Sequence, residues 1–158
     1  MSNLKFEYRG IGKILQSGNL RVPANQREYS WEEENARDLC VDISQALNDD
    51  QENYFLGTIV LTKTQGKLEV VDGQQRLATV TMLIASIRDV YERIGEEKAA
   101  EALNTNFLFR LDRKTQEEES NLVLNTRDHE FFLNNIVLSP NSKNFKKIKE
   151  KASSNNLI

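Results

Sequence analysis

The residues of this chain best suited to chemistry stand in the run Asp72-Gly73-Gln74-Gln75-Arg76. This run follows a short apolar stretch and precedes a strongly periodic pattern, so it enters the predicted first turn of a helix. The N–H groups of a first turn lack partners within the helix, and the helix dipole makes that end partly positive. A cation there opposes the dipole, so Arg76 fits best if a phosphate or carboxylate binds beside it. The run therefore predicts an anion site.

A helix cap is the structural alternative for the same run. Asp72 would be the N-cap residue, and Gln75, three residues later, would close a capping box. That interpretation leaves Gln74 and Arg76 unexplained, although amides and a guanidinium supply many directed hydrogen-bond donors. For Asp72 two roles stay open, namely holding Mg²⁺ through water and capping the helix.

A second candidate group lies upstream, where Gln26, Arg27, Tyr29 and Trp31 follow one another in a short polar segment. An arginine on a tight loop can pair with phosphate through two parallel hydrogen bonds, which makes Arg27 the main candidate. The alternative is a polar loop whose aromatic residues pack on the core, and for Trp31 we adopt that interpretation.

Hydrophobic periodicity predicts the elements that position these residues. Residues 54–62 are almost all apolar and predict a central strand, which forms a hairpin with residues 67–71. Ser30 and Glu33 have the spacing of a capping box that starts a helix. Further helices are predicted over 10–17, 74–94, 97–104 and 127–137, and further strands over 20–22, 107–111 and 121–125, with Glu117, Glu118 and Glu119 in a solvated turn between the last two.

Composition limits the function classes. The chain has 158 residues, of which 39% are hydrophobic and 28% charged, which is typical of a soluble globular protein. No apolar run approaches the ~20 residues that span a bilayer, and no signal peptide is visible, so we expect a cytoplasmic protein without a membrane partner. Cys40 is the only cysteine, which excludes an internal disulfide. The net charge of −3 restricts any DNA contact to a local patch.

Only one such patch is visible. A basic run near the end includes Lys146, Lys147 and Lys149, flanked by Lys143 and Lys151. It is a candidate DNA contact, with a solvated helix face as the alternative. The sole histidine, His129, is expected to be exposed on a helix, and one histidine cannot form an HNH nuclease site.

Three segments together resemble a known family. Residues 22–31 (VPANQREYSW), 55–61 (FLGTIVL) and 71–79 (VDGQQRLAT) resemble the N-terminal domain of the GmrSD type IV restriction endonucleases. The resemblance is close over residues 8–95 and looser to the end. It implies an α+β fold similar to the ParB/sulfiredoxin type, with a small mixed sheet flanked by helices and more helix toward the C-terminus. Residues 1–95 would form the nucleotide-binding core and 96–158 an extension, which we expect to continue into a region absent from this chain.

The resemblance also implies an activity and its residues. Members bind and hydrolyse a nucleoside triphosphate with Mg²⁺, sense modified DNA in anti-phage defence, and couple hydrolysis to cleavage by a separate C-terminal nuclease domain. By position, the catalytic residues would be Asp72, Gln74, Gln75 and Arg76, with Asp72 the tentative metal ligand. The nucleotide-binding residues would be Gly73, Gln26, Arg27, Tyr29 and Trp31. Two departures, Asn25 where an aromatic often stands and Glu28 where a proline often stands, leave the nucleotide preference open.

Three functional hypotheses follow. The first is a Mg²⁺-dependent nucleotide hydrolase module whose partners are nucleotide, DNA and a nuclease domain; a homo-oligomer is compatible with it. The second is a non-catalytic module that binds DNA or modified DNA in the same cleft. The third is a scaffold domain in which both motifs only stabilise the fold.

Overall fold

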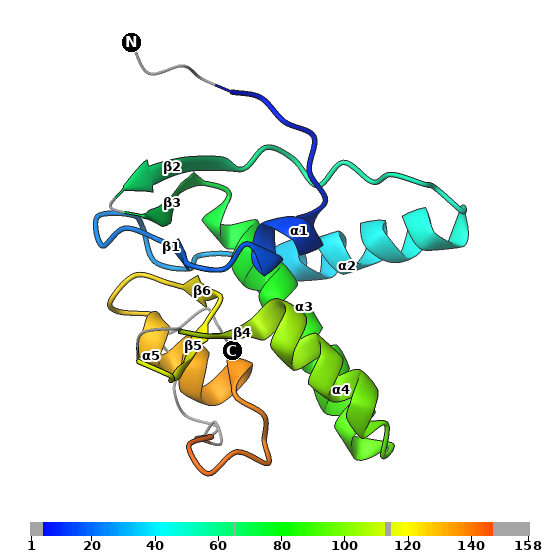
Figure 1. Ribbon diagram of the computed structural model, residues 1–158. Coiled ribbons are helices and arrows are strands. Elements are labelled where there is room, and N and C mark those ends of the chain that lie inside the picture. Colours follow the sequence, from blue (N-terminus) through cyan, green and yellow to red (C-terminus); the bar gives the residue numbers. More distant parts are fainter. Residues whose placement is uncertain (1–4, 65, 113–114, 147–158) are drawn as a thin grey trace.

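The computed structural model describes residues 5–64, 66–112 and 115–146, which form an α+β fold around a small mixed sheet (Figure 1). The sheet has the strand order β2-β3-β1-β6. Strands β2 (Val60–Thr64) and β3 (Lys67–Asp72) form an antiparallel hairpin. Strand β1 (Leu20–Arg21) lies parallel to both β3 and β6 (Leu122–Val123). The predicted fold class is confirmed.

The helices flank this sheet. They are α1 (Ile11–Gln16), α2 (Glu33–Asn48), α3 (Gln74–Arg93), α4 (Glu97–Leu103) and α5 (His129–Phe132). Two π-helical turns, η1 (Asn104–Leu108) and η2 (Leu133–Val137), continue α4 and α5. A second sheet pairs β4 (Phe109–Leu111) with β5 (Glu118–Ser120). Figure 1 shows α3 running from the sheet past α4, while α2 projects to one side. Among the described residues, no helix combines the length and apolar character needed to cross a bilayer.

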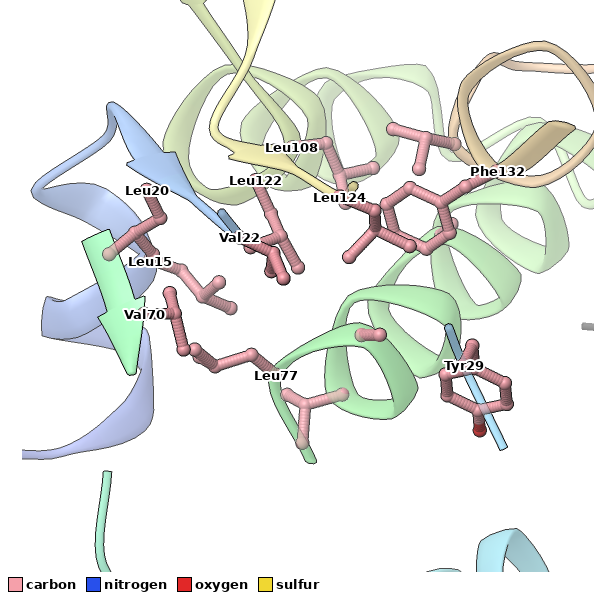
Figure 2. Packing of buried hydrophobic residues seen from close by; sticks show 14 of the residues in the cluster. Leu15, Leu20, Val22, Tyr29, Val70, Leu77, Leu108, Leu122, Leu124 and Phe132 are labelled. Carbon is pink, nitrogen blue, oxygen red and sulfur yellow. The ribbon is translucent and has the colours of Figure 1, made fainter. Parts of the chain in front are cut away.

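One hydrophobic core joins the sheet to α3. Figure 2 shows apolar side chains from α1, β1, β3, α3, β6 and α5 meeting at the centre. The fully buried members include Leu15, Leu20, Leu77, Leu122 and Phe132. Because β6 lies beyond residue 95 and pairs with β1, both halves of the chain contribute to the sheet that carries the first turn of α3.

Most predicted elements are confirmed. The helices over 10–17, 74–94, 97–104 and 127–137 are present, as are the strand at residue 20 and the hairpin that ends in β3. The last predicted helix changes from α-helical to π-helical geometry after Phe132, and that residue points inward as its spacing predicted.

The prediction of a central strand over 54–62 was wrong. Only β2 is a strand, and it forms the edge of the sheet. Residues 54–59 are irregular, Phe55 is 73% exposed, and Gly57 has a φ of +100°. Apolar runs of this length do not distinguish a central strand from a segment that packs its backbone on a helix, which is what residues 57–59 do here.

Two smaller predictions also need correction. Helix α2 begins at Glu33, with Glu32 at the N-cap and the Asn35 side chain accepting its N–H at 3.0 Å, so Ser30 is not the cap. Glu118 and Glu119 are not in a turn but in β5, where Glu119 pairs with Arg110 of β4. The strand predicted over 121–125 is present as β6 and pairs with β1.

The sequence pattern did not indicate a buried arginine in α3. Arg88 is fully buried, and its Nη1 donates to the carbonyl of Val137 at 2.5 Å and to Asn104 Oδ1 at 3.2 Å. Its Nε and Nη2 donate to the Asp89 carboxylate at 2.9 and 2.7 Å. Burial raises the pKa of Asp89 against the opposing effect of Arg88. The network fixes both π-helical turns to α3, because a buried guanidinium requires its hydrogen bonds.

Candidate functional site

The candidate site lies at the first turn of α3. Gly73 is the N-cap residue, and no side chain caps the helix. The structural alternative, a capping box of Asp72 and Gln75, was therefore wrong. Asp72 is the exposed last residue of β3, opposite Val60. The N–H groups of the first turn lack intrahelical acceptors, so this end of α3 keeps its donors and its partial positive charge.

The side chain of Gln75 hydrogen-bonds the backbone of the loop that precedes α2. We call residues 26–31 the Arg27 loop. Gln75 is 5% exposed, and its Oε1 accepts the N–H groups of Ser30 at 2.9 Å and Trp31 at 3.3 Å. Its Nε2 donates to the carbonyl of Glu28 at 3.1 Å. One amide thus joins the two motifs that the sequence analysis singled out, which lie about 45 residues apart.

Other residues of the Arg27 loop strengthen this junction. Gln26 Nε2 donates to the carbonyl of Val71 at 3.2 Å, next to Asp72. The hydroxyls of Tyr29 and Thr79 are hydrogen-bonded at 2.8 Å, and Tyr29 lies beside α3 in Figure 2. Burial raises the pKa of the Tyr29 phenol, which keeps it protonated. Trp31 is partly buried and packs against the core, as predicted.

Arg76 faces the third motif. Its Nη1 donates to the carbonyl of Thr58 at 2.6 Å. A Cβ on Gly57 would lie 2.8 Å from the Arg76 Cζ, so the guanidinium lies directly against a glycine that has positive φ. Gly73 is equally tight against this segment, because a Cβ there would lie 2.9 Å from Ile59 Cγ1. All three resembling segments therefore converge on one helix end.

A small pocket lies between α3 and the Arg27 loop. Its volume is about 10 Å³, about the space of one water molecule. Its lining residues are Val22, Arg27, Tyr29, Gln74, Gln75, Ala78, Leu124, Asn125 and Asp128. Gln74 is 9% exposed, and neither its amide nor the Arg27 guanidinium is hydrogen-bonded to another described residue. Arg76 and Asp72 do not line this pocket, and the Arg76 guanidinium instead contacts Thr58.

Two further residues of this site, Asn125 and Asp128, were not predicted from the sequence. Asn125 is 5% exposed, and its Nδ2 donates to the carbonyls of Arg27 at 3.3 Å and Gln26 at 3.5 Å. Asp128 is also 5% exposed, and its Oδ2 accepts the N–H of Tyr29 at 2.7 Å. The available signal was a pair of short polar residues just before a helix, a pattern that normally indicates only a local turn.

Protein ligands for a metal ion are few here. No group of three or more His, Cys, Asp or Glu side chains comes together within the described ranges. Asp72 is exposed and Asp128 lies in the pocket, so a Mg²⁺ ion at this helix end would take most of its oxygen ligands from phosphate and water.

The basic run lies at a different place. Lys143 and Lys146 line a second, larger groove of about 830 Å³, to which Arg21, Lys67 and Arg110 also contribute. Two acidic residues, Glu118 and Glu119, line it as well. Lys146 pairs with Glu130 at 3.0 Å. The other predicted DNA contacts, Lys147 and Lys149, lie outside the described residues, as does Lys151.

His129 also lines this groove and is half-buried, not exposed as predicted. Its Nδ1 is buried and has no hydrogen-bond partner among the described residues. Burial, and secondarily the charge of Arg21, lower the pKa of His129 below its ordinary value of 6.5.

The lowered pKa predicts a dependence of stability on pH. Above about 6.5 the imidazole is neutral in both the folded and the unfolded chain and contributes nothing. Below that pH the unfolded chain binds the proton more readily, so the free energy of unfolding should fall as the solution is acidified. Because the chain has one histidine, its NMR titration gives the folded pKa without overlap. A folded pKa at or above 6.5 would contradict this account, and His129→Gln should remove this part of the slope.

Comparison with known proteins agrees with the geometry. Residues 11–158 match the family described as GmrSD restriction endonuclease, N-terminal domain. No curated protein matches the chain. The match spans all three segments that meet at the first turn of α3 and also includes Asn125 and Asp128. The chain therefore belongs to the family of GmrSD restriction endonuclease N-terminal domains.

Proposed function

We propose that this chain is the nucleoside-triphosphate-binding module of a restriction system, and that it hydrolyses the nucleotide with Mg²⁺. The observation that carries the proposal is the convergence of three motifs on an uncapped helix end, beside which the Arg27 guanidinium pairs with no described residue. An uncapped helix end offers N–H donors and a favourable dipole to phosphate oxygens. The family to which the chain belongs supports a role in restriction.

The proposal assigns phosphate binding to backbone and arginine together. The N–H groups of the first turn of α3 would hold phosphate oxygens, and Arg27 would pair with them from the loop. Arg76 keeps further N–H groups beyond the one that bonds Thr58, and these would neutralise charge that develops during phosphoryl transfer.

The two glutamines would have different roles. The Gln75 amide is engaged with three backbone groups of the Arg27 loop, so it positions that loop. The Gln74 amide is not hydrogen-bonded to another described residue and lines a pocket of about one water molecule. We assign to Gln74 the orientation of the water that attacks the γ-phosphorus, with the β–γ bridging oxygen as the leaving atom. Coupling of this hydrolysis to cleavage by a nuclease domain is part of the same proposal.

Calorimetric titration of the four nucleoside triphosphates with Mg²⁺ tests the proposal. The unchanged chain should bind at least one of them, and Arg27→Ala should weaken binding about 10- to 100-fold, the effect of losing a charge-assisted pair. The melting temperature should stay the same, because the exposed Arg27 side chain pairs with no described residue. Arg37→Ala is the matched control, since Arg37 is exposed on α2 and pairs only with Glu33 among the described residues. Equal affinities for both variants would refute the assignment of Arg27.

One observation favours a second candidate function, a module that binds DNA without turnover. Five basic residues surround the 830 Å³ groove although the chain as a whole is acidic. Such a patch is the electrostatic footprint of a phosphate backbone. In that case Arg21→Ala and Lys143→Ala would weaken DNA binding and leave nucleotide binding intact. Arg27→Ala would leave DNA binding unchanged and would weaken nucleotide binding.

A further inference from the structure

We propose that Asn125 and Asp128 are positioning residues of the nucleotide site, which fix the direction of Arg27 from the opposite side to α3. The inference rests on the proposed function only for its effect on nucleotide affinity. The structural part, that these two residues set the conformation of the Arg27 loop, stands on contacts alone.

Helix α3 and the segment before α5 bind different backbone groups of the Arg27 loop. From α3, Gln75 binds the backbone of residues 28, 30 and 31. From the segment before α5, Asn125 binds the carbonyls of residues 26 and 27, and Asp128 binds the N–H of residue 29. Each of the six residues of the loop is thus hydrogen-bonded through its backbone either to α3 or to the segment before α5. The Arg27 side chain is hydrogen-bonded to no described residue, so the conformation of the loop backbone sets the direction in which it points.

Asn125 and Asp128 are themselves firmly placed. Asn125 Oδ1 accepts the N–H groups of Asp128 at 3.1 Å and Arg127 at 3.2 Å, which closes a tight turn between them. Both residues are buried, and a buried polar group keeps a defined geometry when its hydrogen bonds are satisfied. Outside that turn, Arg127 Nη1 pairs with Glu28 Oε1 at 2.5 Å, a further contact between the same two segments.

Asp128 also supplies the acidic group of the pocket. Its Oδ2 accepts the Tyr29 N–H, and its Oδ1 accepts no hydrogen bond from another described residue. Asp128 lines the pocket with Gln74 and Arg27, whereas Asp72, the acid that the sequence favoured, does not. The structure therefore separates the two acids.

Two substitutions remove the hydrogen bonds to the loop. Asn125→Asp keeps the shape and the acceptor Oδ1 but replaces the donor to the carbonyls of residues 26 and 27 with a charged carboxylate oxygen. Its matched control is Asn35→Asp, because Asn35 Oδ1 only accepts the N–H of Glu32 and an aspartate can do the same. Asp128→Ala removes the acceptor for Tyr29, and Asp38→Ala, at an exposed position of α2, is its control. If Asp128→Ala does not fold, Asp128→Asn tests the charge while keeping an acceptor.

The first measurement needs no nucleotide. Hydrogen–deuterium exchange of the Arg27 loop amides should accelerate about tenfold or more in Asn125→Asp and in Asp128→Ala, because loss of the ties opens the loop locally. The two controls should exchange like the unchanged chain. Unchanged exchange in both site variants would overturn the positioning role, whatever the nucleotide results.

The second measurement is a double-mutant cycle on nucleotide affinity. Asn125→Asp should weaken nucleotide binding about tenfold in the unchanged background and hardly at all in an Arg27→Ala background, because it acts through Arg27. If the effects of Asn125→Asp and Arg27→Ala on nucleotide affinity were fully additive, Asn125 would not act through Arg27. If the unchanged chain binds no nucleotide, the proposed function fails, while the exchange measurement still decides whether Asn125 and Asp128 position the loop.

Discussion

Replacing Gln75 with alanine is expected to lower the free energy of unfolding by about 3 kcal/mol, the cost of removing the hydrogen bonds of three partly buried backbone groups. The N–H groups of Ser30 and Trp31 and the carbonyl of Glu28 would all lose their bond to one amide. The Arg27 loop would then separate from α3. Nucleotide affinity should fall about 100-fold or more, because the positions of Arg27 and the helix end would no longer be coupled. Chemical denaturation and calorimetric titration measure the two effects.

The neighbouring glutamine is the control for this prediction. Gln74 has the same side chain and is also buried, yet its amide is not hydrogen-bonded to another described residue. Gln74→Ala should therefore cost about 1 kcal/mol or less in stability while hydrolysis is lost. If the two alanine variants were equally stable, the account of Gln75 as the fastener of the loop would be wrong.

Replacing Gly73 with alanine should destabilise the fold by about 3 kcal/mol, the sum of left-handed backbone strain and a steric clash. Gly73 has a φ of +91°, and an added Cβ would lie 2.9 Å from Ile59 Cγ1 and 3.3 Å from Ile59 Cα. The segment that carries Gly57 and Thr58 would have to move away from the helix end. Thermal denaturation should therefore show a clearly lower melting temperature.

Gly66 separates the two contributions. It also has a positive φ, +80°, but no atom lies within 4 Å of where its Cβ would be. Gly66→Ala should therefore cost about 1 kcal/mol, the strain alone. Equal losses for the two glycine variants would show that close packing at Gly73 contributes nothing.

Helix α3 could be predicted because it depends on local pattern. Its apolar residues recur at helical spacing over five turns, and Gly73 and Gly95 mark its ends. The edge position of β2 could not be predicted from the same kind of signal. Leu61 of this strand packs against the core, and an apolar run does not identify its partner.

The candidate site, too, could be predicted only in part. The sequence indicated which residues gather at the helix end, and most of them do. It did not indicate that Gln75 would serve the loop instead of a ligand, nor that Arg76 would contact Thr58. It did not indicate Asn125 and Asp128, because their partners lie 98 and 99 residues away. A hydrogen bond to a backbone group that distant produces no recognisable spacing in the sequence. Arg88, fully buried with partners on three elements, is a case of the same kind.

The most direct test of the central claim is an amide-resolved NMR titration of the ¹⁵N-labelled chain with Mg²⁺ and a non-hydrolysable nucleoside triphosphate. The account predicts the largest shifts at the amides of Gly73, Gln74, Gln75 and Arg76, together with those of the Arg27 loop. Shifts confined to Arg21, Lys67 and Lys143 around the larger groove, with the first turn of α3 unchanged, would contradict it.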